Sequence, residues 1–342
     1  MVLDPAGRQL EYGTYLGGRG EDSAAAIALA RNGDVVYVAG STSSPDFPVT
    51  ESATQRKLQG SINGFLSAVD WRSGKLLYST YLGGNSADNV TALAVARDGS
   101  VYVGGVTQST QWPNVVFRQF GSCGASDGFI IKLDPTGRSR PEGIRIGGSG
   151  NEDVAAIDLD SEGNLYVAGS TDSLNFPQNG AEFPKIGSGL VLKIDGREFS
   201  SGPASVRWSR RVGGHGDDAL LAVSAKMPGS VFATGRSSSS DFPTTPGAQY
   251  RGLSAQNDSI LVRLRTSTGR LQFATFVSGT QARYADWHND AATGVVADTS
   301  ENVYLTAYTI GDRLPVTRTA PQAKREDNTE PFVLRMKFAV LK

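Results

Sequence analysis

One feature dominates the sequence: it repeats itself about every 65 residues. A Gly-Gly pair, or Ser-Gly in the last copy, has its second glycine at positions 18, 84, 148, 214 and 279. An aromatic residue inside a short apolar run recurs at Tyr37, Tyr102, Tyr166, Phe232 and Tyr304. An apolar residue before a proline recurs at Phe47, Trp112, Phe176, Phe242 and Leu314. Because internal repeats decide the architecture of a chain, three markers with one period predict five tandem units.

Each unit has the pattern of four short β-strands. In the second unit, apolar runs occupy residues 91–95, 101–103 and 129–133, and a fourth run leads into the next Gly-Gly pair. Residues 97–99 and 134–137, which separate these runs, contain the Asp, Pro and Gly residues that favour tight turns. No segment shows a sustained apolar period of about 3.6 residues, so we expect few helices. The 41 glycines among 342 residues agree with a chain rich in turns.

Four antiparallel strands repeated five times are typical of a β-propeller. The last unit lacks a fourth strand, whereas residues 8–16 have the pattern of one. We therefore predict an all-β, five-bladed β-propeller with four antiparallel strands per blade, as a single domain over residues 1–342. Residues 8–16 would pair with residues 331–338, complete the fifth blade and close the ring, which removes exposed sheet edges. The expected blades are 17–82, 83–146, 147–212, 213–277, and 278–342 plus 8–16.

Composition excludes several classes of protein. Lys and Arg number 33 against 34 Asp and Glu, so there is no basic surplus of the kind that nucleic-acid binding needs. No apolar stretch is long enough for a transmembrane helix. A signal peptide is not expected, because Asp4 and Pro5 follow Met1 almost at once. Cys123 is the only cysteine, so neither an internal disulfide nor a cysteine-based metal cluster is expected.

Several motifs resemble a known family. The runs at residues 78–84 (YSTYLGG) and 163–171 (GNLYVAGST), together with Asp46-Phe47-Pro48, are similar to the bacterial β-propeller repeats called SBBP repeats. The resemblance implies a propeller from a large bacterial protein that is secreted or exposed at the cell surface, and it implies hardly any chemistry. The family name implies seven blades; five units are counted here, and we follow the count.

The loops predict where a ligand would bind. Strands alternate in direction within a blade, so the long Phe-Pro loops and the Gly-Gly crossovers between blades share one face of a propeller. The opposite face carries only tight turns. Since function concentrates on long loops held by a rigid scaffold, we expect a protein or glycan partner on the long-loop face.

Acidic residues recur at the crossovers of all five units: Asp22, Asp88, Glu152, Asp218 and Asp290. In one interpretation they form a carboxylate ring that holds a hard cation such as Ca²⁺. In the other, each carboxylate accepts backbone N–H bonds from its own crossover turn. We favour the structural interpretation, because a feature present in every unit usually serves the packing of the units.

The fifth crossover breaks the repeat with seven extra residues. It contains residue types that dominate binding hot spots, which makes it the candidate partner contact: Arg283, Tyr284, Trp287 and His288. The alternative is that Tyr284 and Trp287 pack over the seam where the two chain ends meet.

The only two histidines, His215 and His288, lie in crossovers of consecutive units. Carboxylates share these loops, so a Zn²⁺ or Ca²⁺ site is a second hypothesis, with the candidate ligands His215, Asp217, Asp218, Asp286 and Asp290. The alternative is a chance arrangement among variable surface loops, and no other cofactor is expected.

The sequence favours a non-catalytic interaction scaffold, and we expect the domain to be monomeric. Two histidines without a recurring Ser partner give no basis for a Ser-His-Asp triad, and acids in every unit are a poor sign of distinct acid and base roles. The alternatives are a multivalent lectin with one sugar pocket per groove and, less favoured, a carbohydrate-active enzyme. In a lectin the aromatic residues of the Phe-Pro pairs would stack on sugars. In a scaffold they would pack each long loop against its own blade.

Overall fold

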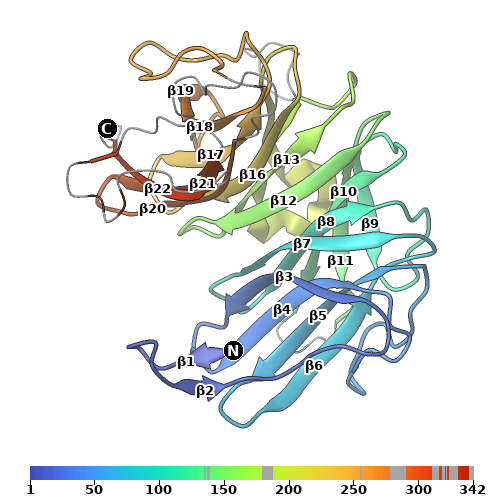
Figure 1. Ribbon diagram of the computed structural model, residues 1–342. Helices are drawn as coiled ribbons and strands as arrows, with labels where there is room; N and C mark the ends of the chain where they lie inside the picture. Colours follow the sequence, from blue (N-terminus) through green and yellow to red (C-terminus); the bar gives the residue numbers. More distant parts are fainter. Residues whose placement is uncertain are drawn as a thin grey trace. The chain divides into compact units, whose positions relative to one another are not determined.

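The computed structural model describes residues 1–134, 136, 139–178, 188–254, 256–277, 290–309, 316–317, 320, 322 and 330–338. Within these residues nearly all of the regular secondary structure is β-strand, which confirms the predicted all-β class. The helix found there is a short 3₁₀ helix, η1 (Gly196–Ser205). Figure 1 shows the sheets following one another along the chain, from the first repeat in blue to the fifth in red.

Each repeat forms one sheet, in which neighbouring strands are antiparallel with one exception. The first sheet contains β3 (Asp22–Leu29), β4 (Val35–Thr42), β5 (Asn63–Asp70) and β6 (Lys75–Leu82). The second contains, in spatial order, β7 (Asp88–Val95), β8 (Val101–Thr107), β10 (Asp127–Leu133), β11 (Glu142–Gly147) and β9 (Val116–Gly121), the last parallel to β11.

The remaining repeats follow the same order of strands. The third sheet contains β12 (Glu152–Leu159), β13 (Asn164–Thr171), β14 (Gly189–Asp195) and β15 (Val206–Val212). The fourth contains β16 (Asp218–Ser224), β17 (Ser230–Ser237), β18 (Asp258–Arg265) and β19 (Leu271–Val277). The fifth, in the described residues, contains β20 (Ala291–Ala297), β21 (Asn302–Thr309) and β22 (Glu330–Lys337).

The start of the chain differs from the prediction. β2 (Leu10–Tyr12) pairs with β1 (Val2–Leu3), and the expected pairing of residues 8–16 with residues 331–338 is not found among the described residues. The cause is a stable local turn: Asp4 Oδ1 accepts the backbone N–H groups of Arg8 and Gln9, at 2.5 and 2.8 Å. Gly7 takes the left-handed conformation (φ +67°) that this turn needs. A hairpin between near neighbours costs little closure entropy, so it competes well with a distant strand.

In the first three sheets, a glycine at the start of the third strand makes room for the first strand of the next sheet. A Cβ atom on Gly64 of β5 would lie 2.5 Å from Cγ2 of Val90, the third residue of β7. The same arrangement joins Gly128 to Val154, and Gly189 to Leu220, at 3.2 Å in both cases. The absence of a side chain on one sheet therefore makes room for an apolar side chain from the first strand of the next.

In three of the repeats, the segment after the Phe-Pro or Trp-Pro pair bonds to the outer strand of its own sheet. In the second repeat this segment is β9, a strand that the sequence analysis did not predict. In the first repeat it bonds to β6 through Thr50 N to Ser79 O, at 3.0 Å. In the fourth repeat it bonds to β19 through Thr245 N to Ala274 O, also at 3.0 Å. Exposed backbone groups on an edge strand invite pairing with other chains, and these segments occupy them.

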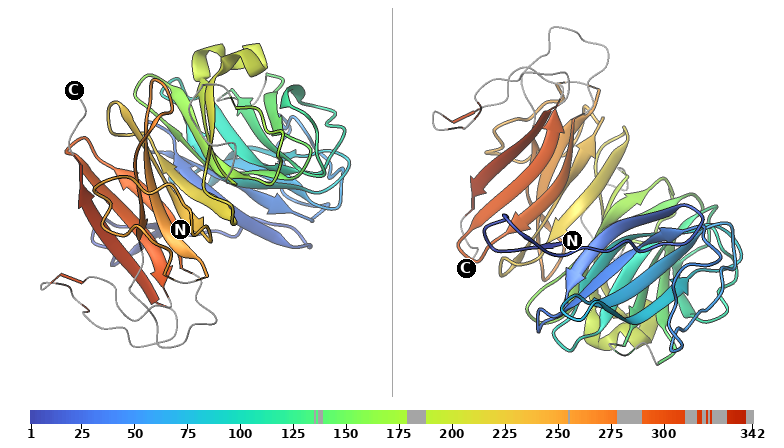
Figure 2. Two further views of the ribbon diagram at one scale, coloured as in Figure 1. Left: turned by 90° about the horizontal axis from the view of Figure 1, so that it is seen from above. Right: turned by 60° about the horizontal axis from the view of Figure 1, so that its bottom comes forward.

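The chain divides into two compact units. One comprises Met1–Val154 with Glu198–Pro203, and the other comprises Ala155–Arg197 with Ala204–Lys342. The residues of η1 that belong to the first unit are held there by Phe199, whose ring packs edge-on against Tyr102 at 5.5 Å. Figure 2 gives two further views of η1 and of the sheets. The single-domain organisation stays a prediction.

Candidate functional site

The crossover carboxylate of the second sheet, Asp88, is fully buried and saturated with hydrogen bonds. Its Oδ2 accepts the backbone N–H of Gly84 and the hydroxyl of Ser109, each at 2.7 Å. Its Oδ1 accepts the hydroxyl of Thr107 at 2.5 Å. One carboxylate thus joins the Gly-Gly crossover to the end of the second strand. We call this arrangement the crossover knot.

The crossover knot recurs along the chain. The carboxylate accepts the N–H of the second glycine in the first, third and fourth repeats: Asp22 from Gly18 at 2.8 Å, Glu152 from Gly148 at 2.7 Å, and Asp218 from Gly214 at 3.0 Å. In the fifth repeat, Asp290 Oδ2 accepts the hydroxyl of Thr309 at 3.0 Å. These are the five acids that recur at the crossovers in the sequence.

The knot also contains a serine that the sequence analysis missed. Ser44, Ser109 and Ser239 donate their hydroxyls to the crossover carboxylates of their repeats, at 2.9, 2.7 and 2.9 Å. Each follows the last Thr or Ser of the second strand by two positions and donates its backbone N–H to that hydroxyl. Ser173 donates its N–H to Thr171 in the same way, at 3.0 Å. The signal that could have revealed this serine is the recurring spacing Thr-x-Ser, or Ser-x-Ser in the fourth repeat, at the end of the second strand.

Burial changes the electrostatics of these acids. Loss of solvent raises the pKa of Asp88 and of Asp218 above the ordinary value of 3.8, although the hydrogen bonds to the carboxylates act in the opposite direction. Both carboxylate oxygens of Asp88 already accept N–H or O–H bonds and keep few lone pairs for another ligand, whereas Oδ1 of Asp22 and of Asp218 accepts no hydrogen bond from the described residues. The geometry of the knot therefore suits the fixing of a turn.

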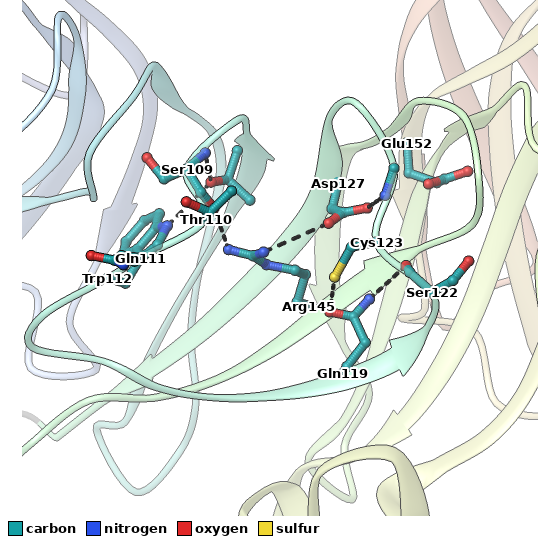
Figure 3. A network of polar contacts seen from close by, with 12 residues as sticks. Ser109, Thr110, Gln111, Trp112, Gln119, Ser122, Cys123, Asp127, Arg145 and Glu152 are labelled. Atoms are coloured by element: carbon teal, nitrogen blue, oxygen red, sulfur yellow. Dashed lines mark hydrogen bonds and ion pairs between the residues drawn. The ribbon is translucent and has the colours of Figure 1, made fainter.

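A second polar contact fixes the same loop from the fourth strand, as Figure 3 shows for Arg145. Arg145 Nη2 donates to the carbonyl oxygen of Ser109 at 2.5 Å, and Nη1 lies 3.8 Å from Oδ2 of Asp127. Burial raises the pKa of Asp127, while the N–H of Gly124 and the charge of Arg145 lower it. The guanidinium thus ties β11, the start of β10 and the loop after β8 together.

Different side chains perform this task in other repeats. Tyr81, at the equivalent position of β6, donates its hydroxyl to the carbonyl oxygen of Ser44 at 2.7 Å. Arg211 in β15 donates to the carbonyl oxygen of Ser173 at 2.8 Å. In the fourth repeat the position is Phe276, which has no donor, and its ring packs against Phe242 at 5.2 Å. The position therefore anchors the loop with whichever chemistry its residue offers.

The aromatic residues before proline are buried plugs. Phe47 packs against Phe65 with ring centroids 4.5 Å apart, and Trp112 packs against Phe129 at 5.2 Å. Phe176 and Phe242 are buried as well. These rings do not offer a free face on which a sugar could stack.

The structure places His215 beside a residue that was not among the predicted ligands. Its Nδ1 lies 2.5 Å from Oδ2 of Asp241, and Oδ1 of Asp241 accepts the His215 backbone N–H at 2.9 Å. These two contacts lower the pKa of Asp241, the backbone bond being the larger cause. The carboxylate of Asp218 belongs instead to the crossover knot, and Asp217 donates its N–H to Ser238.

No group of three or more His, Cys, Asp or Glu side chains in the described residues is arranged to hold a metal ion. The remaining candidates lie outside the described residues: Arg283, Tyr284, Asp286, Trp287 and His288. The metal hypothesis and the partner contact in the fifth crossover therefore stay predictions.

Comparison with protein families supports the resemblance stated above. Residues 144–177 match the SBBP family, which is described as a β-propeller repeat. The match runs from within β11 through β12 and β13 to the Phe176-Pro177 pair. The chain therefore carries an SBBP-type β-propeller repeat. A comparison with curated proteins gives no match.

Three solved structures are distantly similar to the chain. Hydrazine synthase of Kuenenia stuttgartiensis is 14% identical with a TM-score of 0.47, over 97% of this chain and 66% of that one. The quinohemoprotein alcohol dehydrogenase ADHIIG of Pseudomonas putida HK5 is 11% identical with a TM-score of 0.40, over 90% and 47%. The tail fiber of Staphylococcus aureus phage P68 is 8% identical with a TM-score of 0.33, over 90% and 52%. The chain thus spans less than two thirds of the length of each of these proteins.

The described residues contain few helical segments. None of their helices has the length and apolar character that crossing a bilayer requires.

Proposed function

We propose that this chain is a non-catalytic β-propeller scaffold that binds a protein partner, and that it belongs to a bacterial secreted or cell-surface protein. The observation that carries the proposal is the crossover knot. Its acids are the most regular polar feature of the chain, and in the described residues they hold backbone groups in place, as Asp88 holds Gly84. General acid and base catalysis needs two carboxyl groups with distinct roles and access to substrate, which such uniform contacts do not favour.

A partner would recognise the residue that follows each Gly-Gly pair. This residue has the same backbone setting in different repeats but changes in chemistry. Arg19 lies 3.5 Å from Asp46 and its side chain is 95% exposed, whereas His215, beside Asp241, is 77% exposed. Asn85 instead accepts the N–H of Gln111 at 3.1 Å. A fixed frame with different exposed groups suits one asymmetric partner better than a repeated sugar site.

We further propose that the sheets close into a five-bladed ring through the faces of the first and last sheets. Both faces expose apolar side chains that their counterparts in the middle of the chain bury. Val333 of β22 is 74% exposed, whereas Ile130 at the equivalent position of β10 is fully buried. Ile27 of β3 is 67% exposed. Exposed apolar side chains on two terminal sheets favour a mutual contact.

The glycine fit between neighbouring sheets gives a second argument for closure. The position at the start of the third strand, which we call the hole position, is a glycine wherever the side chain that packs against it is Val90, Val154 or Leu220. Pro331 holds the hole position in the fifth repeat, and Ala24 holds the entering position in the first. Where the residue at the hole position is larger, the residue proposed to pack against it is smaller, as close packing requires.

The test of closure is an engineered disulfide between Ala24→Cys and Pro331→Cys, with Cys123→Ser to remove the native thiol. Gly64→Cys with Val90→Cys is the positive control, because a Cβ on Gly64 would lie 3.5 Å from Cβ of Val90, a separation that a disulfide allows. We expect both pairs to form an intramolecular bond under mild oxidation. A terminal pair that stays reduced while the control pair oxidises would refute the ring.

The test of the scaffold function is a glycan array probed beside a displayed-peptide library. We expect no glycan to be retained, and selected peptides to lose binding in Arg19→Ala/His215→Ala but not in the control Arg56→Ala, an exposed residue of the first long loop. Retention of one glycan class by the native protein, undiminished by the double substitution, would favour the lectin alternative instead.

A further inference from the structure

A hollow of about 510 Å³ lies at the turns that join the first and second strands of the first two sheets. It is lined by Leu29, Arg31, Val95, Ala96 and Arg97, all of which belong to the first compact unit. Leu29 is largely exposed, and both arginines are exposed. The crossovers lie at the opposite ends of these strands, so the hollow is separate from them.

The two arginines are not used by the fold. Among the described residues, no ion pair with a carboxylate involves Arg31 or Arg97. By contrast, Arg72 in the same compact unit lies 2.5 Å from Asp34 and over the ring of Trp71. The two guanidinium groups therefore remain available to a ligand.

The pair of arginines is also specific to two neighbouring repeats. They occupy the same position in the first and second units, nine residues after Asp22 and Asp88. The third, fourth and fifth units have uncharged residues there: Ser161, Met227 and Thr299. A requirement of the fold would act on every repeat, so the charge at this position points to a local purpose.

The chemistry of the lining selects the ligand. Guanidinium groups bind carboxylate and phosphate oxygens through two parallel N–H bonds, and two cations that line one hollow repel each other until an anion enters. Leu29, Val95 and Ala96 offer an apolar surface beside them. The volume is within the range of small-molecule sites, about 300–1,000 Å³. We propose that this hollow binds an amphipathic anion, with an acidic head group on the arginines and a short apolar chain against Leu29 and Val95.

The experiment is isothermal titration of the native protein with octanoate, acetate and octanol. Octanoate should bind at least about tenfold more tightly than either of the others, because only octanoate uses both the charged and the apolar lining. Octyl phosphate and inorganic phosphate form a second arm, which shows whether the head group is a carboxylate or a phosphate. Acetate binding as tightly as octanoate, or octanol doing so, would overturn the amphipathic assignment.

Single substitutions locate the site. Arg31→Gln and Arg97→Gln should each weaken octanoate binding about tenfold, the usual loss for a hydrogen bond to a charged group. The matched control Arg56→Gln should leave it unchanged within about twofold, which is the resolution we ask of the titration. Leu29→Ser should weaken octanoate but not acetate. Equal weakening by Arg56→Gln, or no weakening by either arginine of the hollow, would refute the site. Circular dichroism checks that the variants are folded.

Discussion

Removing the carboxylate of Asp88 should destabilise the protein strongly, because its three hydrogen-bond donors lie in a buried knot. In Asp88→Ala, the N–H of Gly84 and the hydroxyls of Thr107 and Ser109 lose their acceptor. A buried donor left without a partner costs about 1–3 kcal/mol. Hydroxyls can rotate towards other acceptors, whereas the Gly84 N–H cannot. We therefore expect the free energy of unfolding to fall by about 3–5 kcal/mol.

The first repeat provides a matched control for this measurement. Asp22 makes the same contacts to Gly18 and Ser44, but it is only partly buried, so water can replace its carboxylate. Asp22→Ala should cost about 1 kcal/mol, the usual value for a hydrogen bond open to solvent. Burial, more than the number of contacts, would then set the cost of breaking a knot.

The assay is equilibrium urea unfolding followed by circular dichroism, together with hydrogen exchange of the Gly84 amide. Exchange reports on the knot itself, even if the two compact units unfold separately. In Asp88→Ala, protection of that amide should be lost. A loss of stability below about 1 kcal/mol, or one no greater than that of Asp22→Ala, would show that the knot does not hold the crossover in the way described.

Three further outcomes are expected. Phe242→Ala should lower the free energy of unfolding by about 3–5 kcal/mol, because it removes a buried ring; a loss under about 1 kcal/mol in urea unfolding would contradict the plug assignment. Burial raises the pKa of Asp218, so the native state binds a proton more readily than the unfolded chain. Stability contributed by this group should therefore rise as the pH falls towards 3.8, and urea unfolding of Asp218→Asn should lack that contribution. Addition of EDTA, Ca²⁺ or Zn²⁺ should leave the melting temperature unchanged, whereas a rise with Zn²⁺ that His215→Ala abolishes would establish a metal site at that histidine.

The strands could be read from the sequence wherever the repeat imposed them. The runs 91–95 and 101–103 lie within β7 and β8, because alternating apolar residues between two turn signals leave a chain few alternatives. β9 could not be read in this way. Val116–Gly121 becomes a strand because it docks beside β11, and that pairing depends on where the loop after Trp112 returns to the sheet.

The start of the chain shows the limit of matching one strand to another. Residues 8–16 resemble a fourth strand, but the backbone groups of a strand do not specify which strand it pairs with. The turn at Asp4 brings a nearby partner, β1, into place. The candidate site also has parts that the sequence reveals and parts that it does not. The crossover acids were visible because they recur, whereas the hollow was not, since Arg31 and Arg97 come together only when two sheets stack.

The fit of Gly64 against Val90 has a consequence for how such a chain can grow or be rebuilt. The two halves of each fit belong to different repeats, so a repeat is not a self-contained module when it is cut at its Gly-Gly pair. A copied repeat inserted after the second sheet must therefore present a side chain about as large as valine to Gly128. Duplication that begins and ends within a sheet would carry both halves of a matched junction together, and this is the cut that an engineer should choose to lengthen the array.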